Sequence, residues 1–272
     1  MIPTYVINLK RQPERRALMA KLLADRGIEP IWVDAVDASN PTEQELSQIK
    51  RMPNWGPWGE FRGYIKGVNL SHLRAIQAFL DTTHPYGLIM EDDVHISSDM
   101  ANWLASTDWI PHDADLVKVE RWRDDRLYVM RSRAASPYRN RLIRRLESRH
   151  VGGAGYILSR GFANRLINQK EFDLAIDHLL FNPAVSELCR GAKIYQVEPA
   201  LVQQGNEPLA LQNNGKARPV STMSPQSPMS RAQRWHQAWI RGVAELWMLP
   251  VFIFRLASMK ATLGRIPMAR DQ

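Results

Sequence analysis

Three consecutive carboxylates, Glu91, Asp92 and Asp93, are the residues whose types and spacing point most directly to chemistry. They follow an apolar run at residues 88–90, which is typical of a strand buried on both faces of a parallel sheet. Ligands collect at the carboxyl ends of such strands, and carboxylate oxygens suit Mg²⁺ or Mn²⁺ completed by substrate phosphates. The stretch therefore predicts a metal–diphosphate site, with a solvated acidic turn as the alternative.

The elements that must position these carboxylates read as an α/β fold. A strand–helix–strand unit at the N-terminus, with Pro13 as the first helical residue and Gly27 as the stop, predicts a parallel sheet. Ser71 is expected to cap a helix that leads into the acidic strand. Residues 40–67 are expected to form a long irregular loop, either a lid or a segment anchored by its aromatics. Further strands are expected over residues 116–119, 156–158 and 194–197, and a further helix over residues 160–167.

Composition divides the chain of 272 residues into two parts. The net charge is +8, and residues 215–272 hold nine basic and two acidic residues, so the tail carries most of it. We expect a catalytic domain over residues 1–214 and a Pro/Ser linker with a basic, aromatic-rich tail over residues 215–272. The single Cys189 excludes an internal disulfide. Phosphate-loop, dinucleotide, zinc and serine-hydrolase motifs are absent from the sequence.

Four stretches together resemble a known family. In chain order they are Val6-Ile7-Asn8-Leu9 followed by Pro13-Glu14-Arg15-Arg16, then Leu70-Ser71-His72-Leu73, then Leu88-Ile89-Met90-Glu91-Asp92-Asp93-Val94, then Gly155-Tyr156-Ile157-Leu158-Ser159. Over residues 4–205 the chain resembles glycosyltransferase family 25, the lipooligosaccharide glycosyltransferases whose animal relatives modify collagen. It departs from the family pattern before Ser71, where residues 67–70 replace a Gly-Cys-Ala-type run.

The resemblance implies a GT-A type fold, a Rossmann-like α/β domain that binds a nucleotide-sugar through a DxD-type motif and Mn²⁺ or Mg²⁺. It also implies inversion at the transferred sugar, with UDP-galactose a frequent donor among bacterial members. We therefore expect an inverting hexosyltransferase that moves galactose from a UDP-sugar to a lipopolysaccharide, a lipooligosaccharide or a related surface glycan. Specificity depends on pocket contacts that one sequence does not reveal.

Within that resemblance each candidate residue has an expected role. Glu91 and Asp93 are expected to bind the metal, with Asp92 as an alternative ligand or a ribose contact. The expected nucleotide contacts follow the first two strands or lie in the Ser-His motif: Asn8, Arg11, Arg15, Arg16, Asp34, Ser71 and His72. A solvated helix face is the alternative for Arg15 and Arg16, and a satisfied core histidine is the alternative for His72.

Inverting transfer needs a base that takes the proton of the acceptor hydroxyl. Asp177, a carboxylate flanked by apolar residues, is the expected base, since such surroundings sharpen a carboxylate as a base. It is alternatively a further metal ligand, and His178 is a candidate for either role.

The tail combines charge with aromatic residues, which favours an interfacial helix on an anionic membrane. The alternative is a helix that packs on the catalytic domain through Trp247, Phe252 and Phe254. We expect a cytoplasmic protein, peripheral on the inner face of the membrane, whose partners are a nucleotide-sugar donor, a glycan or glycolipid acceptor and the membrane surface.

Three rival functions remain from the sequence. A nucleotidyltransferase would place a glycine-rich basic loop after the first strand, where this chain has Asn8 and Lys10. A nucleic-acid-binding protein would leave the acidic triplet unexplained, so no nucleic-acid partner is expected. A membrane-associated glycan- or nucleotide-binding protein without catalysis is the alternative that we retain.

Overall fold

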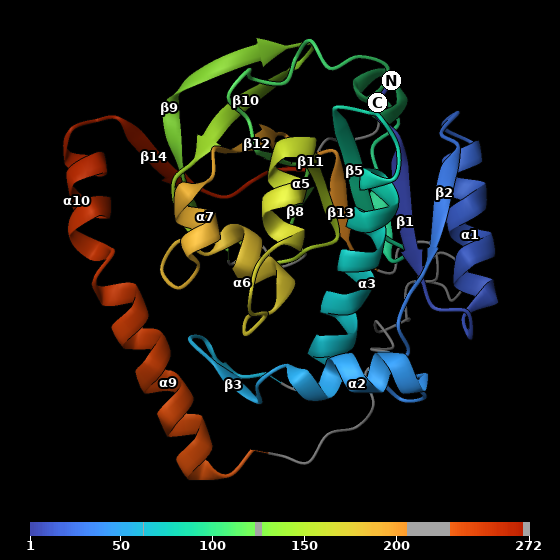
Figure 1. The fold of residues 1–272 in the computed structure, drawn as a ribbon. Helices are drawn as coiled ribbons and strands as arrows, with labels where there is room; N and C mark the ends of the chain where they lie inside the picture. The colour runs from blue at the N-terminus through green and yellow to red at the C-terminus, as the bar shows by residue number, and fades with distance from the viewer. Residues whose placement is uncertain (62, 123–126, 206–228, 269–272) are drawn as a thin grey trace, which may run out of the picture.

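The computed structural model describes residues 1–61, 63–122, 127–205 and 229–268 (Figure 1). A nine-stranded sheet in the order β14-β9-β10-β12-β7-β11-β5-β1-β2 forms its centre. The strands are β1 (Thr4–Asn8), β2 (Pro30–Asp34), β5 (Tyr86–Glu91), β7 (Leu116–Lys118), β9 (Val129–Tyr138), β10 (Arg141–Leu146), β11 (Gly155–Ser159), β12 (Ile194–Glu198) and β14 (Ala261–Gly264). The predicted α/β class is confirmed.

The half of the sheet that ends in β2 is the Rossmann-like part. Strand β1 pairs in parallel with both β2 and β5, in a register that sets Tyr5 beside Ile31 and Ile89. Successive side chains of a strand point to opposite faces, so Tyr5 and Val6 enter different core clusters. Both faces are therefore covered, which is the pattern that the apolar run at residues 88–90 predicts.

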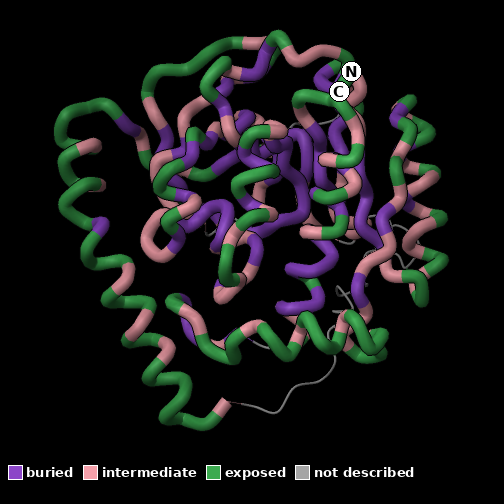
Figure 2. The backbone as a smooth tube through the Cα atoms, in the orientation of Figure 1, coloured by how far each residue is buried: buried purple, intermediate pink, exposed green. Residues whose placement is uncertain are grey.

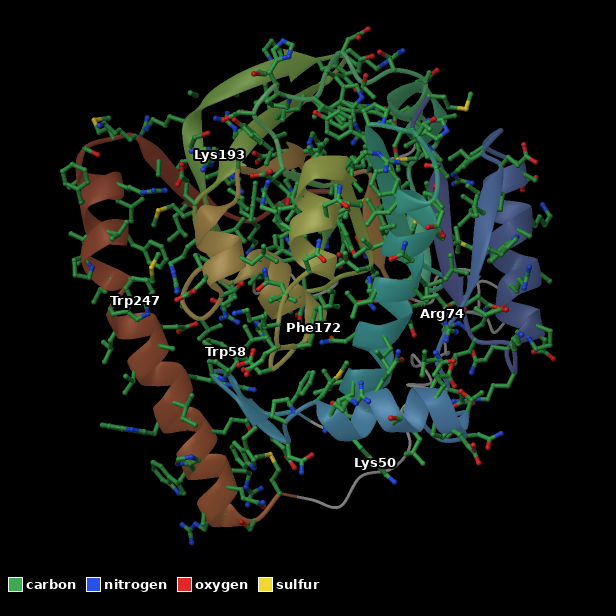
Figure 3. The ribbon with its side chains drawn as sticks, in the orientation of Figure 1. Lys50, Trp58, Arg74, Phe172, Lys193 and Trp247 are labelled. Atoms are coloured by element: carbon green, nitrogen blue, oxygen red, sulfur yellow. The ribbon has the colours of Figure 1, made fainter. Side chains whose placement is uncertain are left out.

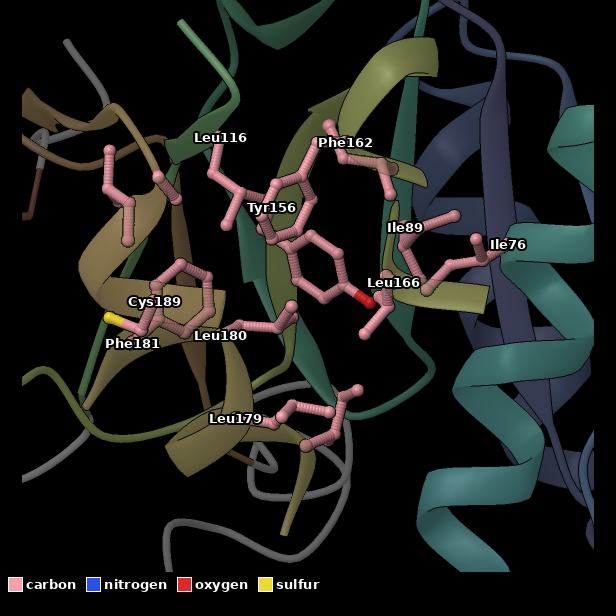
Figure 4. Close-up of a cluster of buried hydrophobic side chains, with 14 of the residues drawn as sticks. Ile76, Ile89, Leu116, Tyr156, Phe162, Leu166, Leu179, Leu180, Phe181 and Cys189 are labelled. Carbon is pink, nitrogen blue, oxygen red and sulfur yellow. The ribbon is translucent and has the colours of Figure 1, made fainter. Parts of the chain in front are cut away.

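Helices cover the two faces of the sheet and create the two cores (Figures 1 and 2). One face packs against α1 (Pro13–Ala24) and α4 (Met100–Leu104). The other face packs against α3 (Gly63–Leu80), α5 (Arg160–Ile167), α6 (Ile176–Phe181) and α7 (Glu187–Gly191). In Figure 4 the Tyr156 ring lies among the side chains of this second core, between Phe162 and Leu180.

The other half of the sheet is antiparallel except where β12 runs parallel to β7. Strands β9 and β10 form a hairpin from the arginine-rich residues 129–146, for which the sequence indicated no strand. Edge strand β14 comes from the predicted tail and pairs with β9, so the last part of the chain belongs to the main sheet.

Residues 40–67 are more regular than predicted, and the loop prediction was wrong. They contain α2 (Glu43–Arg51), which Thr42 begins with a capping box, and a hairpin of β3 (Trp55–Gly56) and β4 (Gly59–Glu60). Helix α3 begins at Gly63, so Ser71 lies within the helix and the prediction of a cap there was also wrong. The glycines and prolines between residues 53 and 67 are typical of loops, so the sequence did not predict this short hairpin or the start of the helix.

A three-stranded sheet flanks the carboxyl end of β5. It pairs β13 (Val202–Gln204) with β6 (Val94–Ile96) and with β8 (Glu120–Arg121). Because β6 follows the acidic triplet directly, this pairing fixes the chain on the far side of Asp93. Most of the predicted Pro/Ser linker at the start of residues 215–272 lies outside the described residues.

The end of the chain forms α9 (Arg231–Leu246) and α10 (Leu249–Ala257), which run along one side of the molecule (Figure 1). Ser230 begins α9 with a capping box. Among the described residues no helix has an apolar stretch long enough to cross a bilayer.

Candidate active site

An open pocket lies at the carboxyl ends of β5, β1 and β2, where an α/β sheet binds its ligands. Its walls come from the ends of these three strands, from residues 35–39 after β2, and from α3. Besides the acidic triplet, four predicted site residues line it: Arg11, Arg15, Ser71 and His72. Asn8 does not line the pocket, but its side chain donates to Asp92.

The acidic triplet divides into two parts. Glu91, Asp92 and Asp93 all line the pocket, but Asp92 is held from behind by Asn8 Nδ2 at 2.5 Å and by Arg15 Nη2 at 2.5 Å. Gln204 of β13 donates from Nε2 to Glu91 Oε2 at 3.0 Å and lies 3.5 Å from Asp93 Oδ1. Asp92 is therefore a positioning group, whereas Glu91 and Asp93 are joined on the side of Gln204.

The electrostatics of the triplet favour a bound cation. Burial and the neighbouring charge of Glu91 raise the pKa of Asp93 to about 7, although Arg15, 3.4 Å away, opposes the shift. Burial also raises the pKa of Asp92. When carboxylates lie so close together that one of them resists ionisation, a divalent cation bound there stabilises their negative charge.

The side chains fit a metal completed by substrate. Within the described residues no group of three or more His, Cys, Asp or Glu side chains is arranged to hold an ion. Glu91 and Asp93 offer two carboxylates, and Mg²⁺ and Mn²⁺ commonly bind to one or two carboxylates plus phosphate oxygens and water. The donor set therefore suits a metal that arrives with a diphosphate.

His72 is both buried and part of the pocket wall. Its Nε2 lies 3.3 Å from Glu91 Oε1, and its Nδ1 lies 3.0 Å from the Tyr156 hydroxyl. Since a carboxylate only accepts, Nε2 carries the proton and Nδ1 accepts from Tyr156. Burial and the charge of Glu91 raise the pKa of Tyr156 well above its usual value, so the hydroxyl keeps the proton that it donates. His72 is therefore a buried histidine with both ring nitrogens partnered that also lines the pocket, and its contact with the donor stays a prediction.

Ser71 acts on the backbone of the loop after β2. Its hydroxyl donates to the Gly67 carbonyl at 2.7 Å and accepts from the Val36 N–H at 2.9 Å. A Cβ on Gly67 would lie 2.9 Å from the Ala38 Cβ, so only glycine lets α3 approach the loop this closely. The predicted Ser-His motif thus shapes the pocket wall through Ser71 and holds Glu91 through His72.

The loop after β2 supplies a carboxylate that the sequence did not single out. Asp37 lines the pocket, and it accepts from Arg11 Nε at 2.5 Å and from the Ser39 hydroxyl and N–H. Burial alone would raise the pKa of Asp37, but the hydrogen bonds from Ser39 and Arg11 lower it on balance. Asp37 is therefore an ionised acceptor that lines the pocket.

Two predicted nucleotide contacts lie outside the pocket. Asp34 is exposed and pairs with Lys10 at 3.1 Å, and it does not line the cavity. The Arg16 guanidinium lies over the Trp32 ring at 4.7 Å. The helix thus turns Arg15 inward and Arg16 outward, because neighbouring residues of a helix point about 100° apart.

A glycine turn joins the acidic triplet to the predicted base. Residues 152–154 precede β11, which begins at Gly155, and the Ala154 carbonyl accepts from the Glu91 N–H at 3.1 Å. Gly152 has a positive φ of 88°, and a Cβ there would lie 2.3 Å from Glu120 Oε1, so the turn needs glycine.

A buried ion pair missed by the sequence reasoning supports that turn. Glu120 Oε2 accepts from Lys118 Nζ at 2.9 Å and from the Ala154 N–H at 2.9 Å, and both side chains are fully buried. Burial raises the pKa of Glu120 to about 7, against the attraction of Lys118. The pair is closed to solvent, so its role is to position the turn.

Asp177 lies on the other side of the glycine turn from Glu91. Its Oδ2 accepts from the Gly152 N–H at 3.2 Å and its Oδ1 from the His178 N–H at 2.9 Å. Asn69 of α3, fully buried, fixes the chain before it by donating to the Leu174 carbonyl at 2.7 Å and accepting from the Ile176 N–H at 2.8 Å. Asp177 does not line the pocket that holds the triplet.

Beyond Asp177 lies a cluster built from distant segments. The His178 ring lies 4.9 Å from the ring of Trp58, and the Arg149 and Arg241 guanidinium groups lie 5.1 and 5.5 Å from the same indole. Arg241 of α9 donates from Nε to the Trp58 carbonyl at 3.1 Å. Figure 3 shows Trp58 in the β3–β4 hairpin and Trp247 at the end of α9. The cluster is the wall next to Asp177, on the side away from the triplet.

Comparisons with known proteins show which family the chain belongs to. The profile described as "Glycosyltransferase family 25 (LPS biosynthesis protein)" matches residues 1–180. The chain is 30% identical over 208 residues to "Lacto-N-neotetraose biosynthesis glycosyltransferase LgtE" of Neisseria gonorrhoeae, covering 74% of this chain and 73% of that protein. It is 31% identical over 209 residues to LgtB of the same species, with 74% and 73% covered.

More distant matches include a human protein and a solved structure. Human "Procollagen galactosyltransferase 2" is 28% identical over 219 residues, covering 73% of this chain and 34% of that protein. A glycosyltransferase involved in glycosylating the major capsid of PBCV-1 aligns with 8% identity and a TM-score of 0.40, over 79% of this chain and 99% of that one, a similarity too low to inform function. The family match and the Neisseria relatives establish that the chain belongs to glycosyltransferase family 25, and it is thus a glycosyltransferase of the LPS biosynthesis class.

Proposed function

We propose that this protein moves galactose from UDP-galactose to a lipooligosaccharide or lipopolysaccharide glycan, with inversion at the anomeric carbon. The observation on which this depends is the acidic pocket at the carboxyl ends of β5, β1 and β2, with arginines on one side and Asp177 beyond the glycine turn. The printed names of the relatives support the sugar and the acceptor class, since one is a galactosyltransferase and two act in lacto-N-neotetraose biosynthesis.

Donor binding is assigned to the pocket itself. Arg11 and Arg15 line it next to carboxylates that hold their guanidinium groups in place, and guanidinium groups in such a pocket suit the donor's phosphates. Asp37 is the acceptor that we assign to the ribose hydroxyls, whereas the sequence analysis expected a nucleotide contact at Asp34. Tyr64 and Val68 of α3 supply apolar wall for the base or the sugar.

Glu91 and Asp93 are the residues that would hold Mn²⁺ or Mg²⁺. When bound, the ion offsets the negative charge that grows on the leaving nucleoside diphosphate. Arg15 shares this task from the protein side, because its guanidinium already lies between Asp92 and Asp93. His72 holds Glu91 from behind, which keeps the carboxylate oriented toward the pocket.

Asp177 is the proposed base. It takes the proton of the acceptor hydroxyl while that oxygen forms a bond to the anomeric carbon, and the bond from this carbon to the diphosphate oxygen breaks. Two backbone N–H groups, of Gly152 and His178, hold the carboxylate and leave lone pairs for the acceptor. Attack from the face opposite the leaving group inverts the configuration.

The test is to incubate the protein with UDP-galactose, Mn²⁺ and a lipooligosaccharide acceptor and to determine the anomeric configuration of the product by NMR. The donor is α-linked, so a β-galactoside supports the proposal. An α-galactoside would overturn inversion. UDP-galactose binding without transfer to any acceptor tested would favour the alternative, a glycan- or nucleotide-binding protein without catalysis.

A further inference from the structure

The exposed apolar surface is concentrated on one part of the molecule, residues 231–263, which we name the C-terminal arm. It comprises α9, α10 and most of β14 (Figure 1). Of eighteen exposed large hydrophobic side chains among the described residues, twelve lie on this arm. Figure 2 shows α9 and α10 as mostly exposed backbone beside a buried sheet. So large an exposed apolar surface indicates a binding surface.

Seven of these twelve exposed side chains form one stripe along the two helices. They recur at positions 235, 239, 243, 246, 249, 253 and 256, spacings of three and four residues that place them on one helical face. Trp239 is 72% exposed, Leu246 65% and Ile253 57%. The stripe thus runs without interruption from the start of α9 to the end of α10.

The opposite side of α9 is already bound to the protein. Arg241 donates to the Trp58 carbonyl at 3.1 Å, and Trp247 Nε1 donates to the Ala184 carbonyl at 3.0 Å. The His236 ring lies 5.5 Å from the ring of Trp55. Packing on the catalytic domain therefore uses mainly the other face of α9 and leaves most of the apolar stripe exposed, although Trp239 and Val243 also line a hollow with Pro57 and Ala184.

The charge of the arm identifies what would cover it. Between residues 231 and 263 there are five basic residues and one acidic residue, Glu245. Glu245 pairs with Arg149 of the domain, and Arg255 pairs with Glu147. Arg231 and Arg234 lie exposed at the start of α9. An occupant that accepts both apolar side chains and basic ones is an anionic lipid surface.

Two other occupants fit less well. A second copy of this chain would bring two arms of like charge together, which is repulsive. A nucleic acid would stack its bases on aromatic rings, but much of the stripe is aliphatic, including Val243, Leu246 and Ile253.

We propose that the C-terminal arm lies in the plane of an anionic membrane surface, with the apolar stripe inserted and the basic residues at the headgroups. Neither α9 nor α10 is long enough to span, so the arm lies on the bilayer. Helix α9 is hydrogen-bonded to Trp58, which belongs to the wall next to Asp177. The same helix would therefore hold the acceptor side of the enzyme at the lipid surface.

The experiment is co-sedimentation of the full chain with vesicles of phosphatidylcholine alone and of phosphatidylcholine with phosphatidylglycerol. We expect binding to the anionic vesicles that is at least tenfold tighter and that weakens with added salt. Leu246→Ser with Ile253→Ser should reduce this binding at least tenfold. Ile31→Ser with Leu46→Ser, which removes two exposed aliphatic side chains elsewhere, is the matched control and should leave it unchanged.

Vesicle binding requires neither donor nor acceptor, so it is independent of the transfer reaction. Equal binding to both vesicle types, or equal binding by the arm variant and the control, would overturn the proposal. A doubling of mass in sedimentation velocity that the arm variant abolishes would assign the stripe to a second copy instead. Binding to RNA or DNA in place of vesicles would likewise overturn it. Unchanged UDP binding by the variants shows that they are folded.

Discussion

The donor pocket and the wall beyond Asp177 are built in different ways. The pocket takes its charged residues from the ends of three neighbouring strands and from the first turns of the elements that follow them. The wall combines the β3–β4 hairpin, the segment after β10, α6 and α9, which are far apart in the sequence. The donor side is thus a property of the sheet, whereas the acceptor side depends on how separate segments and the C-terminal arm pack. We expect changes on the two sides to affect different substrates.

The largest effect should come from Asp177→Asn. Loss of the base should reduce the transfer rate by about 10²–10⁴-fold, while the variant still binds UDP like the wild type. Steady-state kinetics and calorimetry check the two halves of this prediction. Asp173→Asn, four residues away and half-buried, is the control and should transfer normally. Near-normal transfer by Asp177→Asn would remove Asp177 as the base and break the division into two sides.

A smaller effect on the donor side should come from Arg15→Gln. Without the guanidinium, Asp92 and Asp93 lose their shared cation, which should weaken UDP binding about 10–100-fold and destabilise the fold by about 1–3 kcal/mol. Calorimetry and chemical denaturation measure these effects. Arg16→Gln lies one residue on but outside the pocket, so it should change neither. Equal effects of the two changes would contradict the inward placement of Arg15.

Arg241→Gln sharpens the comparison from the acceptor side. Losing the hydrogen bond to the Trp58 carbonyl should loosen α9 against the hairpin and raise the KM for the acceptor about 3–10-fold. The KM for the donor should not change, because Arg241 is remote from the donor pocket. Arg234→Gln, exposed on the same helix, is the control in a soluble acceptor assay. A donor KM that rises equally would show that the two sides are not separable.

The smallest effect concerns stability and pH. The pKa of Asp93 is raised to about 7 in the folded protein, so the folded state binds a proton that the unfolded state releases near pH 4. In the presence of a chelator, stability should therefore fall as the pH rises from about 4 to 7. Asp93→Asn mimics the protonated form and should raise the Tm by about 2–4 °C at pH 8 but not at pH 4. An unchanged Tm at pH 8 would show that burial and the neighbouring charges do not destabilise the ionised form of Asp93.

The donor half could be predicted because its signals are local. The buried strands, the helix that begins at Pro13 and the acidic triplet each follow from a few consecutive residues. The same local reasoning predicted a nucleotide contact at Asp34, the last residue of β2. The pocket is lined instead by Asp37 of the following loop, whose carboxylate accepts hydrogen bonds from Ser39 and Arg11. A strand end is visible in a sequence, but the path of the loop after it is set by tertiary contacts such as that of Ser71 with Val36.

The acceptor half could be predicted only in part. Asp177 stood out as a carboxylate among apolar residues, but its support by Asn69 and the Gly152 N–H comes from more than twenty residues away. The Lys118–Glu120 pair was hidden because two charges within a strand pattern usually face solvent. Strands β9 and β10 were not predicted because they are rich in arginine. Arg131 and Arg141 are buried, and they donate to backbone carbonyls and carboxylates that lie far away in the sequence.

The central claim is that Glu91 and Asp93 form a metal-dependent site for the donor's diphosphate. The most direct test is isothermal calorimetry of UDP with and without Mn²⁺, on the wild type, on Asp93→Asn and on the exposed control Asp108→Asn. We predict UDP binding that requires Mn²⁺ in the wild type and the control and that is lost in Asp93→Asn. Equal UDP affinity with and without the metal, or full binding by Asp93→Asn, would contradict the claim.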